Sequence, residues 1–398
     1  MQISTRIQNL AESETLAMSQ RSTELKANGV DVINLSVGEP DFFTPNNIKA
    51  AAKKAIDDNF SFYMPVNGYL SLRKAICDKL LNYNGLEYSA EQIICTNGAK
   101  QAICETLMCI LNPDDEVILP APYWVSYVDM IKIAEGKTVV VEANINNNFK
   151  ITVEQLRAAI TPKTKAFILC SPSNPTGSVY SQKELEEIAN VLKEHPEIFI
   201  ISDEIYEYIT YIGKVPSLAQ FDFLKERIAI INGVSKGYAM TGWRIGWVAA
   251  PKFLANAISK LQGQFTSGAS SIAQKAAEEA YLGGNESVEN MRVMFEKRRN
   301  LIVSLAKEIS GFEVAVPDGA FYIFPVCKSY FGKKTADGKI IEKSSDLAMY
   351  LLDNAHVASV GGDAFGAKNC IRFSYATSEE NITKAMQRIK IALEKLKE

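Results

Sequence analysis

The chain has 398 residues, of which 47% are apolar and 22% charged, and its formal net charge is −3. This balance is ordinary for a globular protein with a sizeable core, and it excludes a general affinity for nucleic acid or for anionic membrane surfaces. No apolar run is long enough to span a membrane, and the first residues lack the apolar segment of a secretory signal. We therefore expect a cytoplasmic protein.

Cysteine and histidine are too scattered to predict a disulfide framework or a metal site. The seven cysteines are odd in number and include no CxxC pair, which favours reduced thiols in the core. Only two histidines are present, His195 and His356, so a histidine-based triad or zinc site has little material. No metal is expected.

Apolar runs alternate with helix-like segments through the middle of the chain. Residues 99–111, for example, place Ile103, Leu107 and Leu111 at helical spacing directly after a run of apolar residues. Ser181 and Glu184 predict a capping box at the start of another helix. Continuous apolar strands separated by helices are typical of a largely parallel sheet that is covered on both faces. The strands expected are EQIICT, DEVILP, GKTVVVEA, KAFILCSP, IFIISDE, RIAIING and GWVAA.

The character of the sequence changes near residue 286. Residues 286–309 predict a long connecting helix, and GAFYIFP and CIRFSYA predict short strands. Thr377 and Glu380 predict the start of a terminal helix with one buried face: Ile382, Met386, Ile389, Leu393 and Leu396.

We therefore predict an α/β fold whose large domain, residues 46–285, contains a mostly parallel seven-stranded sheet between helices and binds the cofactor. A smaller α+β domain would be built from both chain ends. Residues 1–45 would form an N-terminal arm and part of this small domain, and residues 286–398 would form the connecting helix and the remainder.

Polar side chains follow several of the predicted strands, at the sheet edge where α/β proteins bind ligands. The turn at residues 97–100 follows IICT, and its backbone N–H groups could hold a phosphate, although an ordinary tight turn is an alternative. Asn174 lies in a loop that turn chemistry alone could explain. Asp203 and Tyr206 follow IFIIS. Trp124 follows VILPAP, as a core aromatic or as a surface on which a flat ring could stack.

Lys236 lies just after RIAIING, with Ser235 before it and Arg244 eight residues later among three glycines. Burial and a neighbouring cation both favour the neutral, nucleophilic form of a lysine. One ligand would satisfy all of these groups: a planar, phosphorylated molecule with a basic ring nitrogen and an aldehyde. The sequence therefore predicts pyridoxal phosphate, with Lys236 as the amine that reacts with the aldehyde and with Ser235 and Arg244 at the phosphate.

Over essentially its whole length the chain resembles the fold type I aminotransferases, in particular the bacterial-type aspartate aminotransferases. The resemblance is carried by SVGEPDF, YMPVNGYLSLRKAI, TNGAKQA, APYWVSY, SPSNPTG, SDEIYEYI, SKGYAMTGWRIGW, DGAFYIF and IRFSYATSEENI. It implies an enzyme that moves the amino group of L-aspartate to 2-oxoglutarate, giving oxaloacetate and L-glutamate, by a ping-pong mechanism through an aldimine of Lys236.

The resemblance also implies roles around the cofactor ring. Lys236 would carry a proton between the substrate and the cofactor, and Asp203 would keep the pyridine nitrogen protonated. Tyr206 and Asn174 would hydrogen-bond the phenolic oxygen of the ring, and Trp124 would stack on its face.

The resemblance implies that a backbone turn and a residue of a second subunit also contact the phosphate. Ser235 and Arg244 would be joined by the residues of the turn, Gly98, Ala99 and Lys100. Tyr63 of a neighbouring subunit would reach the same phosphate, which implies a homodimer with shared active sites.

For the substrate, the resemblance implies that Arg372 binds the α-carboxylate with its planar guanidinium and that the backbone at Gly38 closes on the same group. Lys100 would bind the distal carboxylate of an amino-acid or 2-oxo acid substrate. The other residues expected to contact the substrate are Ser13, Thr15, Trp124 and Asn174.

Several alternatives remain, because a lysine like Lys100 also occurs outside strict aspartate specificity. The enzyme could be an aminotransferase for prephenate, alanine or aromatic amino acids, or a pyridoxal-phosphate-dependent lyase. A binding-only sensor would need a further domain, and the missing GxGxxG argues against a nicotinamide dehydrogenase. The sequence departs from the family pattern at Gly237, where a hydroxyl residue or alanine is usual, and at Gly361-Gly362, where Pro-Gly is expected.

Overall fold

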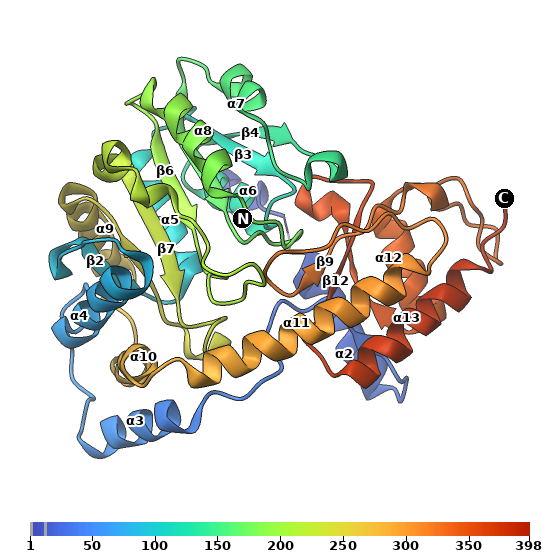
Figure 1. Cartoon of the computed structure of the whole chain (residues 1–398), viewed down its shortest axis with the longest axis horizontal. Helices are drawn as coiled ribbons and strands as arrows, with labels where there is room; N and C mark the ends of the chain where they lie inside the picture. Colours follow the sequence, from blue (N-terminus) through green and yellow to red (C-terminus); the bar gives the residue numbers. More distant parts are fainter. Residues whose placement is uncertain (1–2, 12–13) are drawn as a thin grey trace.

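The computed structural model describes residues 3–11 and 14–398 and contains the predicted seven-stranded sheet (Figure 1). The strand order is β2-β8-β7-β6-β5-β3-β4. All seven runs expected from the sequence form strands of this sheet: β2 (Ile93–Thr96), β3 (Glu116–Ala121), β4 (Lys137–Glu142), β5 (Thr164–Cys170), β6 (Phe199–Asp203), β7 (Ile228–Gly233) and β8 (Gly246–Ala249).

The direction of the strands brings the predicted site residues to one edge. Strand β8 is antiparallel to its neighbours β2 and β7, and the other neighbouring pairs of the sheet are parallel. Strands β2, β3, β5, β6 and β7 therefore point the same way, and their carboxyl ends share one edge. The loops that follow these strands carry the polar residues identified above.

Helices cover both faces of the sheet, as its continuous apolar strands require. Strands β2, β7 and β8 are buried at every position. One face packs against α5 (Ala99–Ile110), α6 (Ser126–Ile133) and α9 (Lys252–Phe265). The other face packs against α4 (Leu70–Lys79), α7 (Val153–Ala159), α8 (Gln182–Lys193) and α10 (Ser271–Leu282), and α3 (Asn46–Asp57) packs against α10. The predicted capping box of α8 is confirmed, since the Ser181 hydroxyl accepts from the Glu184 N–H and the Glu184 carboxylate accepts from Ser181.

A second group of elements lies beside the sheet and is reached through the long helix α11 (Glu286–Lys307), as Figure 1 shows. It contains α2 (Glu14–Ala27), α12 (Ser344–Ala355), α13 (Glu379–Leu393), and two small sheets. One sheet has the order β11-β12-β9, from β9 (Tyr322–Ile323), β11 (Val360–Gly361) and β12 (Ile371–Ser374). The other pairs β1 (Ile33–Asn34) with β10 (Val357–Ala358), so the two chain ends meet. The domain boundaries near residues 45 and 285 stay predictions.

The length of α11 does not make it a membrane helix, because charged residues recur along it. Within residues 3–11 and 14–398, no helix combines the length and the apolar character needed to cross a bilayer.

The start of the terminal helix differs by one residue from the prediction. Ser378 is the N-cap of α13, and its hydroxyl accepts a hydrogen bond from the Asn381 N–H at 3.2 Å. Thr377 instead accepts from the Asn381 side chain at 3.0 Å. The prediction of Thr377 as the cap was therefore wrong: the adjacent hydroxyl residue Ser378 caps the helix, although only Thr377 is followed by a glutamate at the capping-box spacing. All five residues predicted for the buried face are buried, but the helix ends at Leu393, so Leu396 lies beyond it.

Glu204 is a buried acid at the carboxyl end of β6, on a chain segment that otherwise carries site residues. Its side chain is 5% exposed, and its Oε1 accepts from the hydroxyls of Ser202 at 2.9 Å and Ser217 at 2.5 Å. Burial raises the pKa of Glu204 to about 7, and the neighbouring Glu207 acts in the same direction.

We expect Glu204→Gln to flatten part of the pH dependence of stability. Because the folded pKa of about 7 lies above the ordinary 4.5, the native protein retains a proton that the unfolded chain releases, so this group lowers the free energy of unfolding as pH rises between those values. Relative to wild type, Glu204→Gln should therefore gain roughly 1–3 kcal/mol between pH 5 and pH 8, measured by urea denaturation. The exposed Glu186→Gln is the control, and parallel stability curves for wild type and Glu204→Gln would contradict this account.

Candidate active site

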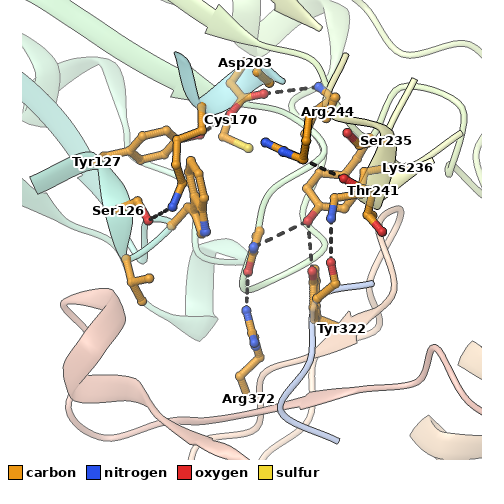
Figure 2. A pocket seen from close by; sticks show the side chains of 18 residues that line it. Ser126, Tyr127, Cys170, Asp203, Ser235, Lys236, Thr241, Arg244, Tyr322 and Arg372 are labelled. Atoms are coloured by element: carbon orange, nitrogen blue, oxygen red, sulfur yellow. Dashed lines mark hydrogen bonds between the residues drawn. The ribbon is translucent and has the colours of Figure 1, made fainter. Parts of the chain in front are cut away.

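A cavity of about 380 Å³ lies at the carboxyl edge of the large sheet and is also lined by Tyr322 of β9 and Arg372 of β12 (Figure 2). In this view Asp203 and Arg372 lie at opposite sides of the cavity, with Lys236 and Tyr127 flanking it. The predicted site residues that line it are Gly38, Ala99, Lys100, Trp124, Asn174, Asp203, Tyr206, Ser235, Lys236, Arg244 and Arg372.

Lys236 enters the cavity from the loop after β7. Its Nζ donates a hydrogen bond to the carbonyl oxygen of Gly38 at 2.5 Å. Burial lowers the pKa of Lys236 to about 8; Glu39 opposes this change, and Arg244 and Arg372 reinforce it. A substantial fraction of this amine is therefore neutral in mildly alkaline solution, as a nucleophilic or proton-transferring lysine requires.

Asp203 ends strand β6 and is 3% exposed. The Tyr127 hydroxyl donates to its Oδ2 at 2.5 Å, and the Ile205 N–H donates to its Oδ1 at 3.2 Å. Burial raises the pKa of Asp203 to about 6, whereas these two hydrogen bonds act in the opposite direction. Both of these hydrogen-bond donors are neutral, so the site can accommodate a cationic group of a ligand next to this carboxylate.

Arg372 is a buried cation on β12, with 1% of its surface exposed. It donates to Asn174 Oδ1 at 2.8 Å and to the Ser36 carbonyl oxygen at 2.5 Å. Its guanidinium lies 4.6 Å from the ring centroid of Tyr322 and 4.9 Å from that of Phe365. The Nε of Arg372 has no hydrogen-bond partner among the described residues. These contacts fix the plane of the guanidinium and leave it able to bind a carboxylate.

The turn before α5 lies against Arg244. Gly98 has a φ of 82°, and a Cβ at this position would lie 2.3 Å from Nη2 of Arg244. Arg244 donates from Nη1 to the carbonyl oxygen of Thr241 at 2.8 Å and from Nη2 to that of Asn97 at 3.2 Å. The N-terminus of α5, the Ser235 side chain and Arg244 thus form a cluster of donors and positive charge suited to a phosphate.

Lys100 is the second residue of α5 and provides another cation at the cavity. Its Nζ donates to the Ser126 hydroxyl at 3.2 Å and lies 5.0 Å from the ring centroid of Trp124. Partial burial lowers the pKa of Lys100, and Arg244 acts in the same direction. No carboxylate of the described residues forms an ion pair with it.

Of the predicted site residues whose side chains the structure describes, Gly98 and Tyr63 do not line the cavity. Gly98 lies behind Arg244, as described above. Tyr63 is 96% exposed, which is compatible with a contact to a second subunit. Ser13 lies outside the described residues, and for Thr15 the structure describes only the backbone, within α2.

Sequence reasoning missed several residues of the cavity wall. Tyr127 and Tyr322 lie inside motifs that carried the resemblance, APYWVSY and DGAFYIF, but a motif does not show which of its aromatic side chains face the ligand. The other missed lining residues are Val125, Ser126, Cys170, Ile205 and Thr241. Tyr127 could have been identified only as the hydrogen-bond donor of Asp203. Because the two residues are far apart in sequence, the sequence does not show that they are in contact.

The two departures from the family pattern fit their surroundings. A Cβ on Gly237 would lie 2.6 Å from the ring of Tyr208, so the hydroxyl residue or alanine that is usual here would clash. A Cβ on Gly361 would lie 2.7 Å from the backbone nitrogen of Ser345. At both positions the neighbouring atoms are too close to leave room for a side chain, which explains the glycine.

The family model for aminotransferases of class I and II matches residues 30–389. The chain belongs to this family. It is a pyridoxal-phosphate-dependent transaminase, and the seven-stranded α/β architecture predicted from the sequence is confirmed by the solved structures that it resembles.

The relatives of this aminotransferase are similar over nearly their whole length. A probable aspartate/prephenate aminotransferase of Rickettsia bellii is 48% identical over 392 residues, which cover 98% of each chain. A bifunctional aspartate aminotransferase and glutamate/aspartate-prephenate aminotransferase of Petunia hybrida is 45% identical, over 99% of this chain and 83% of the relative. The aspartate aminotransferase structure from Rhizobium meliloti has a TM-score of 0.96 and 42% identity, with 100% of each chain covered. That of Thermus thermophilus with maleate has a TM-score of 0.93 and 38% identity, over 98% of this chain and 100% of the other.

We expect Tyr127→Phe to weaken cofactor binding. The substitution keeps the ring but removes the donor to Asp203, which raises the proton affinity of that carboxylate and opposes its pairing with a cationic ring nitrogen. The dissociation constant for pyridoxal phosphate at pH 7.5 should rise roughly tenfold, measured by equilibrium dialysis. Tyr350→Phe, which removes a buried hydroxyl in α12, is the matched control. Equal affinities for wild type and Tyr127→Phe would show that the hydrogen bond does not support the cofactor.

Proposed function

We propose that this aminotransferase moves the amino group of L-aspartate to 2-oxoglutarate in a ping-pong reaction. The observation that carries the proposal is the pair of cations, Arg372 and Lys100, at a cavity that also contains Lys236. Neither cation forms an ion pair with a carboxylate of the described residues, so a substrate with two carboxylates would neutralise both. The maleate in the Thermus thermophilus structure, a dicarboxylate, supports the same class of ligand.

The residues present fit pyridoxal phosphate, the cofactor that family membership implies. Asp203 is a buried carboxylate suited to a protonated ring nitrogen, and Trp124 lines the same cavity. Ser235, Arg244 and the turn before α5 would hold the phosphate. When bound, the cofactor supplies an aldehyde for the exchange of amines and a ring that accepts the electrons released at the substrate α-carbon.

The protein residues then have separate tasks. Arg372 would bind the α-carboxylate and so orient the amino acid, with the Gly38 backbone beside it. The neutral form of Lys236 Nζ would accept the α-proton and return it. Asp203 would hold the proton on the ring nitrogen, and Tyr206 would donate to the phenolic oxygen. Lys100 would select substrates with a second carboxylate.

A homodimer would complete the site, with Tyr63 donated to the phosphate of the partner subunit. The proposal is supported by the apolar residues that the single chain leaves exposed, Phe43 at 92%, Phe62 at 79% and Tyr63 at 96%. Large apolar side chains with this degree of exposure would be covered if they met a second subunit. All seven cysteines are free thiols in the structure, which supports the expected cytoplasmic location.

Prephenate is a second candidate acceptor. The observation that favours it is the name of several relatives, including the Rickettsia bellii protein, as aspartate/prephenate aminotransferases. Prephenate is also a dicarboxylate and would use the same two cations.

The half-reaction with L-aspartate tests the proposed function. When L-aspartate is added to the cofactor-loaded enzyme without an oxo acid, we expect the visible absorption to convert completely and one oxaloacetate to form per site. Lys236→Ala should abolish this conversion. Conversion by alanine or an aromatic amino acid but not by aspartate would reject aspartate as substrate, and continuous release of pyruvate or ammonia would indicate a lyase.

Lys100→Met tests the selection of a second carboxylate. The variant retains the backbone N–H groups of the turn and much of the side-chain volume, but it removes the charge. We expect kcat/KM for aspartate to fall roughly 10- to 100-fold, the loss of one charged hydrogen bond, and that for alanine to change less than about threefold. The control is Lys252→Met, another lysine at a helix start, which lies on α9 and pairs with Glu91. Equal losses for both substrates would exclude this role for Lys100.

A further inference from the structure

Tyr322 is positioned by the small antiparallel sheet. On this sheet Tyr322 of β9 lies opposite Ser374 of β12, and Arg372 is two residues away along β12. Side chains two apart on a strand share a face, so Tyr322 and Arg372 are diagonal neighbours on the face that lines the cavity. The Tyr322 side chain is completely buried.

The ring and the hydroxyl of Tyr322 contact different parts of the site. Its ring supports the guanidinium of Arg372, whose central carbon lies 4.6 Å from the ring centroid. Its hydroxyl lies 2.9 Å from the hydroxyl of Tyr206 and would be 2.6 Å from a Cβ on Gly38. Figure 2 shows the Tyr322 side chain between Arg372 and Lys236. Tyr322 therefore lies where the substrate-binding and cofactor-binding parts of the site meet.

Either hydroxyl could donate in the Tyr206–Tyr322 hydrogen bond, and the neighbouring hydrogen bonds favour Tyr322 as the donor. Arg372 donates to Asn174 Oδ1, which directs the Asn174 Nδ2 donor to Tyr206 Oη at 3.5 Å. Within the described part of the chain, the Tyr322 hydroxyl has Tyr206 as its only hydrogen-bond partner. Its buried hydrogen is satisfied only if Tyr322 donates to Tyr206. Tyr206 then accepts two hydrogen bonds, and its own hydrogen is free to point into the cavity.

We propose that Tyr322 is a positioning residue whose hydroxyl donates to Tyr206 and thereby directs the Tyr206 hydrogen toward the phenolic oxygen of the cofactor. This inference rests on the proposed function, which places that oxygen beside Tyr206. Accepting a hydrogen bond makes a hydroxyl a stronger donor, so Tyr322 strengthens the contact that Tyr206 makes. Nothing in the family motif assigns this task to Tyr322, since it depends on the register of β9 and β12.

Tyr322→Phe tests the proposal, because it keeps the ring beneath Arg372 and removes only the hydroxyl. The pH at which the visible absorption of the loaded enzyme changes reports the proton affinity next to the phenolic oxygen. A donor to that oxygen lowers this midpoint, so we expect Tyr322→Phe to raise it by about 0.5–1 pH unit, as the loss of one hydrogen bond should. Affinity for maleate, which needs Arg372, should stay within about twofold of wild type.

Tyr375→Phe is the matched control, since Tyr375 is also a fully buried tyrosine next to β12 but hydrogen-bonds Tyr211 and the Ala320 carbonyl oxygen outside the cavity. It should leave the midpoint unchanged. An unchanged or lowered midpoint in Tyr322→Phe would overturn the proposal, and a lowered one would show that Tyr206 donates to Tyr322. A large loss of maleate binding would also overturn it, because the hydroxyl would then act through Arg372. If wild type shows no pH-dependent band, the proposed function itself fails.

Discussion

The buried guanidinium of Arg372 is the interaction on which the rest of the site depends. Removing a charge from water is costly unless partners replace the lost hydration, and here the partners are an amide oxygen, a carbonyl oxygen and two aromatic faces. Burial lowers the pKa of Arg372, because the charged guanidinium loses its hydration inside the protein. None of these partners carries a formal negative charge, so the proposed substrate carboxylate would supply the negative charge that the fold lacks. The small sheet must also lie against the edge of the large sheet to place Arg372 there.

Burial also destabilises the charged forms of the other ionisable groups of the cavity. Burial raises the pKa of Asp203 and lowers those of Lys236 and Arg372, so that each charged form is destabilised before a ligand arrives. In the proposed function, the protonated ring nitrogen of the cofactor would neutralise Asp203, and the substrate carboxylate would neutralise Arg372. The neutral form of Lys236, which burial favours, is the form proposed to accept the substrate α-proton. One physical effect, desolvation, thus prepares binding and reactivity together.

Hydrogen bonds join the part of the site proposed for the substrate to the part proposed for the cofactor. Asn174 contacts Arg372 with its oxygen and Tyr206 with its nitrogen, and Tyr322 contacts the same two residues with its ring and hydroxyl. Arg372 and Tyr206 are therefore joined by two separate routes. A shift of the guanidinium on carboxylate binding would be felt at Tyr206, since buried polar networks respond as a unit.

The sequence by itself determined the seven strands, the covered parallel sheet and nine of the residues around the cavity, because continuous apolar runs and the residues that follow each strand are local features. Gly38 and Arg372 came only from the family resemblance. The sequence also determined the family, through motifs spread over the whole chain. Only the tertiary structure decided that Tyr127 and Tyr322 belong to the site, that Gly237 is required by the ring of Tyr208, and that Ser378 caps the last helix. Those outcomes depend on strand register, on contacts between distant residues and on the choice between adjacent hydroxyls, none of which leaves a periodic signal in the sequence.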